Sequence, residues 1–194
     1  MLTLFHAPRS RSSRFIWLLE ELRAPYQVRY VTIQRQNGEG APDPANPHPH
    51  KQVPALLDGE TLITESAAIA LYLTDAYPAG KMGPVVGDPL RGRYLTWLAY
   101  FAGVLEPAVG ARMRPGGPSE AEQRSYETLD AQWRDALRAG PYLLGESVSA
   151  ADILFVSLLQ FGRALMPEGE VYDDYLARMS ARPALAAAQA KDAG

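Results

Sequence analysis

The spacing of hydrophobic and polar residues changes several times along the first 77 residues. Leu2–His6 reads as a short apolar strand, and Gln27–Thr32 alternates apolar and polar residues as a half-buried strand does. Ser12–Leu22 lies between them and places its apolar residues at helical spacing. Asp58-Gly59 separates two further apolar runs, which is typical of a β-hairpin, and a helix is expected over 65–76. The order β-α-β followed by β-β-α predicts a mixed α/β domain over residues 1–77.

The pattern becomes helical after a segment rich in glycine and proline. Residues 78–89 contain six glycines and prolines, which exclude regular structure and predict an interdomain linker over 78–88. Glu120–Arg138 then reads as a charged amphipathic helix, and earlier apolar residues recur at helical spacing: Tyr94, Trp97, Leu98, Phe101 and Leu105. We therefore expect residues 89–194 to form an all-helical domain.

A serine and an aspartate three residues apart mark the start of one of these helices. Ser149 and Asp152 fit a capping box, and Val148 and Ile153 are placed as its hydrophobic staple. Asp152 has two interpretations, a site carboxylate or a helix cap, and the cap is the prediction.

Composition narrows the class of protein. The chain has 194 residues, 47% hydrophobic and 21% charged, with a net charge of −3. These values describe an ordinary globular protein and argue against broad nucleic-acid binding, which requires a basic surface. No apolar run approaches the roughly 20 residues of a membrane span, and the N-terminus lacks a signal-peptide layout. We expect a cytoplasmic protein with no nucleic-acid or membrane partner.

The absence of cysteine removes several kinds of chemistry. Disulfides, cysteine-based metal sites and a cysteine nucleophile are all excluded. His48 and His50 flank a proline, and two loop histidines without cysteine make a poor ligand set. We therefore predict no metal.

The turn between the first strand and the first helix, Ala7–Arg14, is rich in serine and arginine. No His/Asp partner is expected near these serines to activate one as a nucleophile, but a hydroxyl there can donate a hydrogen bond to a bound thiolate. The alternative is that Ser10, Ser12 or Ser13 is simply the helix N-cap. The arginines have two interpretations as well, a solvated face or a cluster that attracts an anion.

The segment from Lys51 to Leu73 contains two groups suited to binding a small acidic peptide. Val53-Pro54 presents a residue whose backbone N–H and C=O can pair with an extended chain. Glu65 and Ser66 fall at a helix N-terminus, where free N–H groups and the helix dipole bind anions.

These motifs resemble the cytosolic glutathione S-transferases, of a bacterial, serine-type or related subclass. The resemblance covers essentially the whole chain in the family's order, and four segments carry it: LTLFHAPRSRSSRFIWLLEEL, KQVPALLDGETLITESAAIALYL, SVSAADILFVSLLQF and YLARMSARPALAAA. It implies a thioredoxin-like N-terminal domain followed by a helical-bundle domain, with glutathione as co-substrate.

The resemblance also assigns residues that bind glutathione. Val53 would pair with its cysteinyl part, with the Val53-Pro54 bond cis, and Gln52 would reach its glycine-end carboxylate. Ser66 would hold the γ-glutamyl carboxylate and Glu65 would face the amino group. His48 suits the family's loop pattern, but Lys51 stands where a glycine is usual, which puts that loop's detailed geometry in question.

The residue that stabilises the thiolate depends on the register of the first helix. In serine-using relatives the serine lies four residues before an arginine, and Arg14 then selects Ser10. Aligned to cysteine-using bacterial relatives, the position holds Arg11 and the neighbouring hydroxyl is Ser12. We rank Ser10 first and Ser12 second, and Arg11 is the candidate for a stabilising cation.

Further residues of the helical domain are candidates for an apolar pocket for the second substrate: Tyr100, Phe101, Val104, Pro107, Phe161 and Leu165. The alternative for each is the core. Glu106 replaces a histidine of some bacterial relatives, which weakens any transfer of substrate preference. The resemblance implies a homodimer, whose cleft the helix from Gly92 would line.

The resemblance predicts an enzyme that joins the glutathione thiolate to an electrophilic apolar substrate. Two alternatives stay open. One is a non-catalytic binding or regulatory protein of the same fold, and the other is a glutathione-dependent isomerase or peroxidase.

Overall fold

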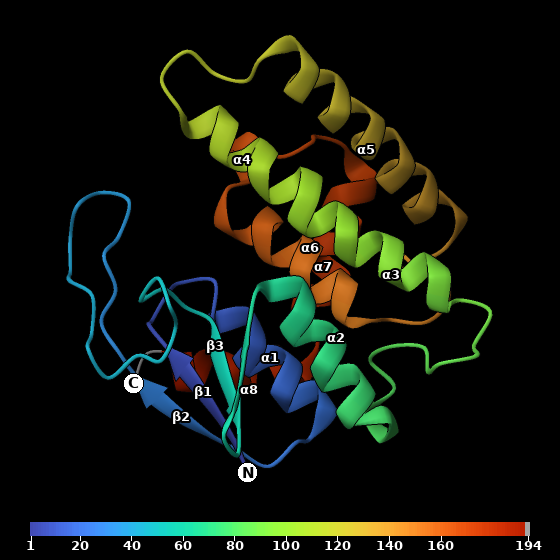
Figure 1. The fold of residues 1–194 in the computed structure, drawn as a ribbon. Coiled ribbons are helices and arrows are strands. Elements are labelled where there is room, and N and C mark those ends of the chain that lie inside the picture. Colours follow the sequence, from blue (N-terminus) through green and yellow to red (C-terminus); the bar gives the residue numbers. More distant parts are fainter. Residues whose placement is uncertain (193–194) are drawn as a thin grey trace. The chain divides into compact units, whose positions relative to one another are not determined.

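The computed structural model describes residues 1–192 and divides into two compact units (Figure 1). Unit 1 contains Met1–Gly80 together with residues 182–192, and unit 2 contains Lys81–Ala181. Unit 1 is thioredoxin-like and unit 2 is helical, which confirms the predicted fold class.

Unit 1 is built on a four-stranded mixed sheet of order β2-β1-β3-β4. β1 pairs in parallel with β2 and antiparallel with β3, which in turn pairs antiparallel with β4. The strands are β1 (Leu2–His6), β2 (Tyr26–Tyr30), β3 (Ala55–Asp58) and β4 (Thr61–Thr64). The helices of this unit are α1 (Ser13–Leu22), α2 (Ser66–Ala76), the short η1 (Pro78–Gly80) and α8 (Pro183–Asp192).

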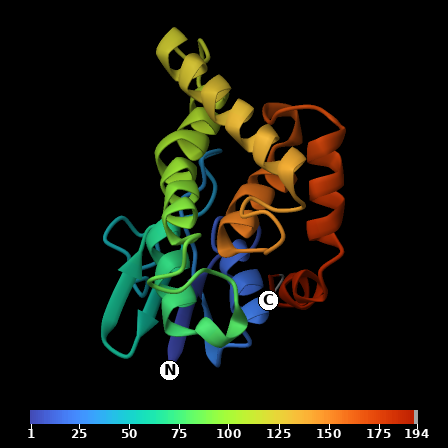
Figure 2. The ribbon, with the colours of Figure 1, turned by 90° about the vertical axis from the view of Figure 1, so that its right-hand side faces the viewer.

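The C-terminal helix α8 packs beside α1, which differs from the predicted assignment of all of residues 89–194 to one helical domain (Figure 2). Ion pairs and the buried side chains of Leu185 and Ala188 accompany this packing. Arg182 holds Glu21 through two hydrogen bonds of 2.5 and 2.8 Å, and Lys191 Nζ lies 2.6 Å from a Glu20 oxygen. The sequence analysis placed residues 183–192 in the helical domain, because no local pattern identifies Glu20 and Glu21 as the partners of Lys191 and Arg182.

Unit 2 contains only helical elements and connecting loops within the described residues. A helical run starts with α3 (Arg91–Tyr100), continues through the π-helix η2 (Phe101–Leu105) and ends with α4 (Glu106–Met113). The remaining elements are α5 (Glu120–Ala139), α6 (Ala150–Phe161), the 3₁₀ turn η3 (Arg163–Leu165) and α7 (Glu170–Ser180). Its core is aromatic, because Trp133 packs edge-on against both Phe155 and Tyr172.

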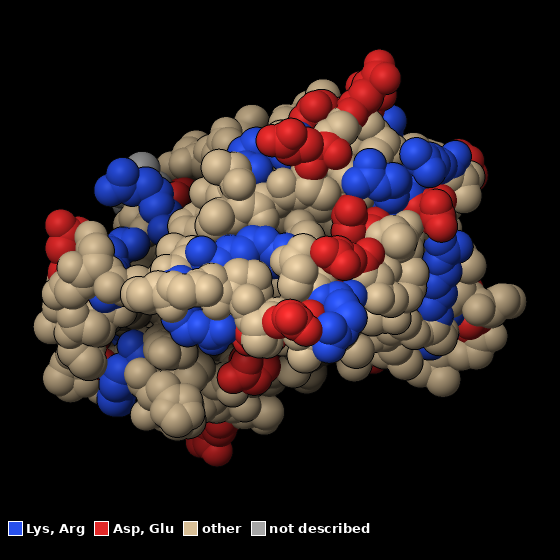
Figure 3. Space-filling model, turned by 90° about the horizontal axis from the view of Figure 1, so that it is seen from above, with Lys and Arg blue, Asp and Glu red and all other residues tan. Residues whose placement is uncertain are grey.

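The exposed side of α5 carries charges of both signs. Arg124, Arg134 and Arg138 each pair with an acidic residue three or four positions earlier in the helix. Figure 3 views the molecule from above, and acidic and basic side chains are interspersed on that face. Alternating charge of this kind is typical of a solvated helix face rather than a basic nucleic-acid surface.

The start of α6 is the capping box that the sequence predicts. The Asp152 carboxylate is fully buried and accepts hydrogen bonds from the Ser149 N–H at 2.7 Å and the Ser149 hydroxyl at 2.8 Å. It also accepts from the Leu143 N–H and the Tyr175 hydroxyl. Asp152 therefore acts as a structural cap.

Two features are absent from the part of the chain that the structure describes. Among residues 1–192, no helix is both long and apolar enough to cross a membrane. Over the same residues, no group of three or more His, Cys, Asp or Glu side chains is arranged to hold a metal ion.

Candidate functional site

The sheet topology of unit 1 brings three predicted site segments to the same edge. Phe5 pairs with Ala55, and Ala55 pairs with Thr64 on the next strand. The chain that leaves β1 after His6, the chain that enters β3 through Pro54, and the chain that leaves β4 toward Ser66 therefore lie beside one another. Their closeness follows from the strand register alone.

A small apolar core fixes two of these segments. Ala7 from the turn after β1 and Val53 from the segment before β3 are buried in one cluster with Phe5, Val31 and Ala55. Because both segments pack on the same cluster, the turn after β1 and the Val53 backbone are held together by the core of the unit.

The Val53–Pro54 peptide bond is cis, as predicted. Val53 is buried through its side chain, and Gln52 just before it is exposed. Gln52 also contributes to local structure, because its carbonyl oxygen accepts a hydrogen bond from the amide of the buried Asn46 at 2.9 Å.

In the loop before Val53, Lys51 occupies the position where the resemblance places a glycine. Lys51 adopts φ +52°, a conformation that favours glycine. Its ammonium group donates to the Asn46 carbonyl at 2.7 Å, and the Asn46 side-chain oxygen accepts from the His48 N–H. Lys51 therefore adopts the left-handed backbone that glycine adopts without strain, and its side chain forms a hydrogen bond within the loop.

Glu65 and Ser66 form the start of α2. Glu65 adopts φ +69° and ψ 126°, a conformation that costs a non-glycine residue about 1–3 kcal/mol. Ser66 is the first residue of the helix and is buried. The Ser66 N–H belongs to the first turn of α2, whose N–H groups have no partner within the helix and attract anions.

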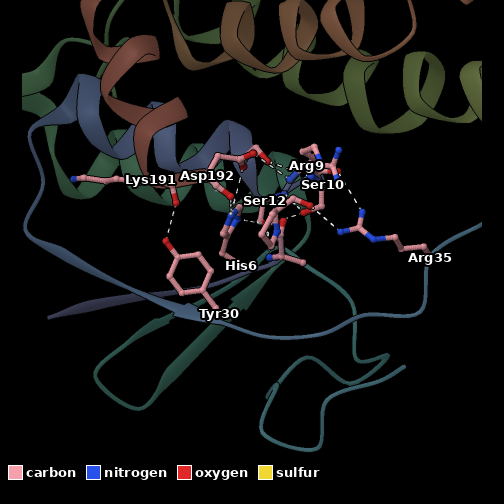
Figure 4. Close-up of polar contacts among 11 residues, drawn as sticks. His6, Arg9, Ser10, Ser12, Tyr30, Arg35, Lys191 and Asp192 are labelled. Atoms are coloured by element: carbon pink, nitrogen blue, oxygen red, sulfur yellow. Dashed lines mark hydrogen bonds and ion pairs between the residues drawn. The ribbon is translucent and has the colours of Figure 1, made fainter. Parts of the chain in front are cut away.

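The turn Ala7–Ser12, which we name the serine turn, contains two connected hydroxyls (Figure 4). The Ser10 and Ser12 hydroxyl oxygens lie 2.8 Å apart. Ser12 is fully buried and accepts a hydrogen bond from the Ala7 N–H at 3.2 Å, whereas Ser10 is only half-buried. Of these two hydroxyls, the Ser10 hydroxyl is the more accessible to a bound molecule.

Ser10 makes local bonds within the turn but is not the N-cap of α1. The N-cap is Ser12, whose side chain makes no capping hydrogen bond. The Ser10 hydroxyl oxygen accepts from the Ser12 N–H at 3.2 Å, and the Ser10 N–H donates to the Ser13 hydroxyl at 3.2 Å. The hydrogen of the Ser10 hydroxyl can be donated either to the Ser12 oxygen or to a bound molecule.

The expectation that no His/Asp partner lies near the serines is wrong. The Ser12 hydroxyl lies 2.8 Å from Nδ1 of His6, which is fully buried at the end of β1. His6 Nε2 lies 3.4 Å from both the backbone oxygen and a carboxylate oxygen of Asp192 in α8. Asp192 could not be found from the sequence because it is 186 positions away from His6 in the chain.

Two further contacts hold the serine turn in place (Figure 4). The Arg9 N–H donates to the Asp192 carboxylate at 3.1 Å, and the Arg35 guanidinium donates to the Pro8 carbonyl at 2.8 Å. Arg9 adopts φ +53°, so these bonds stabilise a strained backbone. Arg11 is exposed beside them.

The sequence contained a signal for His6 but none for Asp192 or Arg35. Leu2, Leu4 and His6 alternate toward one face of β1 and all three are fully buried. A histidine at the third inward position of a strand needs polar partners. The pairing of Arg35 with the carbonyl of Pro8 depends on loop geometry that no local pattern encodes.

The candidate pocket residues occupy different environments within unit 2. Phe101 lies in the core 5.9 Å from the Phe155 ring centroid, which fits its core alternative, and Phe161 is 67% exposed at the end of α6. Tyr100 lines a cavity of about 360 Å³ beside α5 and accepts a hydrogen bond from Gln132. Val104 and Leu165 are half-buried, and Pro107 is exposed.

Comparison with known proteins adds to this geometry. Residues 1–75 match the family model of the glutathione S-transferase N-terminal domain. Glutathione S-transferase GstA of Escherichia coli O157:H7 is 29% identical over 187 residues, 93% of each chain.

Solved structures are similar over nearly the whole length of the chain. A glutathione transferase from Methylococcus capsulatus superposes with a TM-score of 0.81 at 29% identity, covering 100% of this chain and 99% of that one. A sphingomonad glutathione S-transferase complexed with glutathione gives a TM-score of 0.78 at 26% identity, covering 98% of each chain. The motifs, the fold and these relatives agree: the chain belongs to the glutathione S-transferase family.

Proposed function

We propose that the protein is a glutathione transferase in which the Ser10 hydroxyl stabilises the glutathione thiolate. The single observation that carries this proposal is the position of Ser10. Its half-buried hydroxyl stands at the sheet edge shared by the Val53 backbone and the start of α2. A donor beside a peptide-pairing backbone and an anion-binding helix end suits a small acidic peptide that carries a thiol.

The interaction free energies available at Ser10 are large enough to lower the pKa of the bound thiol. An unperturbed thiol has a pKa near 8.5, and lowering it by roughly two units requires just under 3 kcal/mol. A hydrogen bond to a charged group contributes about 1.5–3 kcal/mol. A helix N-terminus adds about 0.3–1 kcal/mol, and α1 begins directly after Ser12.

The chemical step then needs little from the protein. The thiolate sulfur attacks an electrophilic carbon of an apolar substrate, a sulfur–carbon bond forms, and the leaving group departs with its electron pair. The protein keeps the sulfur ionised and holds it close to the substrate, which lowers the barrier through proximity. Arg11, exposed in the same turn, is a second candidate for stabilising the charge.

The anchors of glutathione lie on either side of this hydroxyl. The Val53 backbone pairs with the cysteinyl residue next to cis-Pro54, and Gln52 holds the glycine-end carboxylate. Ser66 binds the γ-glutamyl carboxylate through its hydroxyl and N–H, and Glu65 binds the amino group. Glu65 supports this assignment because its strained backbone is the kind that clusters at binding sites.

The second substrate and the assembly are further parts of the proposal. Tyr100, Phe101, Val104, Pro107, Phe161 and Leu165 are proposed to supply apolar contacts to the electrophile. We place the protein in the cytoplasm as a homodimer, in line with its family. Sedimentation at micromolar concentration tests the dimer, and a monomer there would contradict it.

The proposed function is tested by two assays on the same preparation. The protein should be retained on immobilised glutathione and eluted by free glutathione, and it should conjugate an aryl halide. Retention without conjugation would favour the non-catalytic binding protein. If a hydroperoxide or an isomerisable substrate turns over while the aryl halide does not, the glutathione-dependent peroxidase or isomerase becomes the better reading.

A further inference from the structure

We propose that His6 receives the proton of the glutathione thiol through the Ser10 and Ser12 hydroxyls, with Asp192 as the positioning residue behind it. The proposal rests on the proposed function, because it needs a thiol beside Ser10. It concerns the destination of the thiol proton. The role of Ser10 as a hydrogen-bond donor to the thiolate does not say where that proton goes.

The contacts form one unbroken chain of polar atoms (Figure 4). The Ser10 and Ser12 oxygens are 2.8 Å apart, and the Ser12 oxygen is 2.8 Å from His6 Nδ1. His6 Nε2 is 3.4 Å from Asp192. Ser10, at one end, is the half-buried member, and Ser12 and His6 behind it are fully buried.

The direction of the hydrogen bonds follows from the groups at the ends. His6 Nε2 faces a backbone carbonyl and a carboxylate, which only accept, so Nε2 carries a hydrogen. In a neutral imidazole the other nitrogen is then an acceptor. His6 Nδ1, at 2.8 Å, therefore accepts from the Ser12 hydroxyl in preference to the Ala7 carbonyl at 3.4 Å, and the Ser12 oxygen accepts from the Ser10 hydroxyl.

This arrangement can take one proton without moving a heavy atom. The thiol S–H bond breaks and its proton joins the Ser10 oxygen, the Ser10 hydrogen moves to Ser12, and the Ser12 hydrogen moves to His6 Nδ1. The products are a thiolate that accepts from Ser10 and an imidazolium beside the Asp192 carboxylate. After the conjugate leaves, the reverse movement through Ser10 returns the proton to water.

The surroundings of His6 suit a reversible acceptor. Burial lowers the pKa of His6 below 6.5, and the Asp192 backbone oxygen and carboxylate raise it in part, so the ring is neutral and able to accept at neutral pH. The ring also meets Tyr30 of β2 edge-on, with centroids 5.6 Å apart. Asp192 Oδ1 is buried and accepts no hydrogen bond from the described residues, so an imidazolium would give it a partner.

The test counts protons released when glutathione binds. Thiolate is measured by its ultraviolet absorption and released protons by an indicator dye in weak buffer at neutral pH. S-methylglutathione, which has no ionisable thiol, is the reference for protons released by other groups. In the wild-type protein, clearly fewer protons than thiolates should appear, because the negative charge of the bound thiolate favours the protonated form of His6, which then keeps the proton.

Three variants locate the acceptor. His6→Phe keeps an aromatic ring beside Tyr30, and Ser12→Ala breaks the chain in the middle. Both should release about one proton per thiolate, as a simple ionisation does. Ser13→Ala removes a hydroxyl from the same region without breaking the chain and should keep the wild-type ratio. Binding of S-methylglutathione shows whether each variant is folded.

The outcomes separate the two proposals. A wild-type ratio of about one proton per thiolate would overturn the role of His6 while leaving the thiolate donor intact. Absence of any thiolate at neutral pH would overturn the proposed function itself. If His6→Phe and Ser12→Ala do not fold, Asp192→Asn, which still offers an acceptor to the Arg9 N–H, must raise the ratio, and an unchanged ratio contradicts the proposal.

Discussion

The helices α1 and α6 both begin with serines beside a buried polar network, but the two networks differ in what they leave free. At α6, the Asp152 carboxylate accepts from Leu143, Ser149 and Tyr175, and every partner is a donor with a fixed direction. At α1, the members are hydroxyls and an imidazole, which can donate or accept.

This difference explains why the network at α6 is a structural helix cap and the network at α1 is a candidate binding site. A carboxylate that accepts from surrounding donors is satisfied and adds stability to the fold. The row of hydroxyls ends at the half-buried Ser10, where the network can exchange a proton with a bound molecule or donate to it. Similar residue types at two helix starts thus give a closed network in unit 2 and an open one in unit 1.

The largest expected effect breaks the closed network. Asp152→Ala leaves buried donors of Leu143, Ser149 and Tyr175 without an acceptor, so we expect a loss of about 3–5 kcal/mol in the free energy of unfolding. Urea denaturation followed by tryptophan fluorescence reports it, because Trp133 lies in the same unit. A loss below about 1 kcal/mol would show that the network is not the main support of α6.

The second prediction concerns the N-terminal end of α2 in unit 1, which we expect to contribute to glutathione binding and little to stability. Changing both Glu65 and Ser66 to Ala should weaken glutathione binding by about 30-fold or more, from the loss of two charge-assisted hydrogen bonds. Calorimetry measures the affinity, and thermal unfolding should change little. Affinity equal to wild type would rule out this assignment.

Backbone strain at Glu65 predicts that one substitution can weaken glutathione binding and yet increase the stability of the fold. Glu65→Gly should raise the free energy of unfolding by about 1 kcal/mol, because glycine adopts a positive φ without strain. The same change should weaken glutathione binding. Glu65→Gln, which keeps the side-chain length, is the matched control, and a stability loss in Glu65→Gly would contradict the claim that the strain is maintained for binding.

Ser149 at the start of α6 and Ser10 before α1 allow the two networks to be compared directly. Ser149→Ala should cost about 1–2 kcal/mol of stability, as loss of a buried cap does, and Ser10→Ala should cost about 0.5 kcal/mol. Denaturation curves of the two variants measured side by side give the difference. Equal losses would mean that the serine turn is as purely structural as the capping box.

The smallest expected effect concerns pH. The folded pKa of His6 lies below its unfolded value of 6.5, so its contribution to stability is present above pH 6.5 and is lost as the pH falls through the folded pKa. Stability measured between neutral and acidic pH should therefore fall less steeply in His6→Phe than in the wild type. Parallel curves would show that His6 is not buried in its neutral form.

The sequence predicted the elements well but not the contacts between distant ones. The capping box at Ser149 and the hairpin at Asp58-Gly59 follow local rules, and both are found in the structure. The His6–Asp192 contact joins the two ends of the chain, so no local period could reveal it. No local pattern reveals the partner of α8 either, because its contacts with Glu20 and Glu21 join distant parts of the chain.

Within the candidate site, sequence reasoning identified residue types but not their burial. The spacing to Arg14 ranked Ser10 above Ser12, but only the fold places Ser12 in the interior and Ser10 at the edge. Lys51 was a departure from the family pattern, and the structure shows how the loop accommodates it. Side-chain burial depends on packing between segments, which a linear pattern does not contain.

The central claim is that the Ser10 hydroxyl stabilises the bound thiolate, and titration of bound glutathione tests it most directly. Thiolate absorption is followed against pH in the wild-type protein, in Ser10→Ala and in the Ser13→Ala control. The wild-type and control proteins should show a thiol pKa roughly two units below 8.5, and Ser10→Ala should raise it by about one to two units with little change in affinity. An identical thiol pKa in the wild type and Ser10→Ala would contradict the claim, and a shift in Arg11→Ala instead would assign the role to that cation.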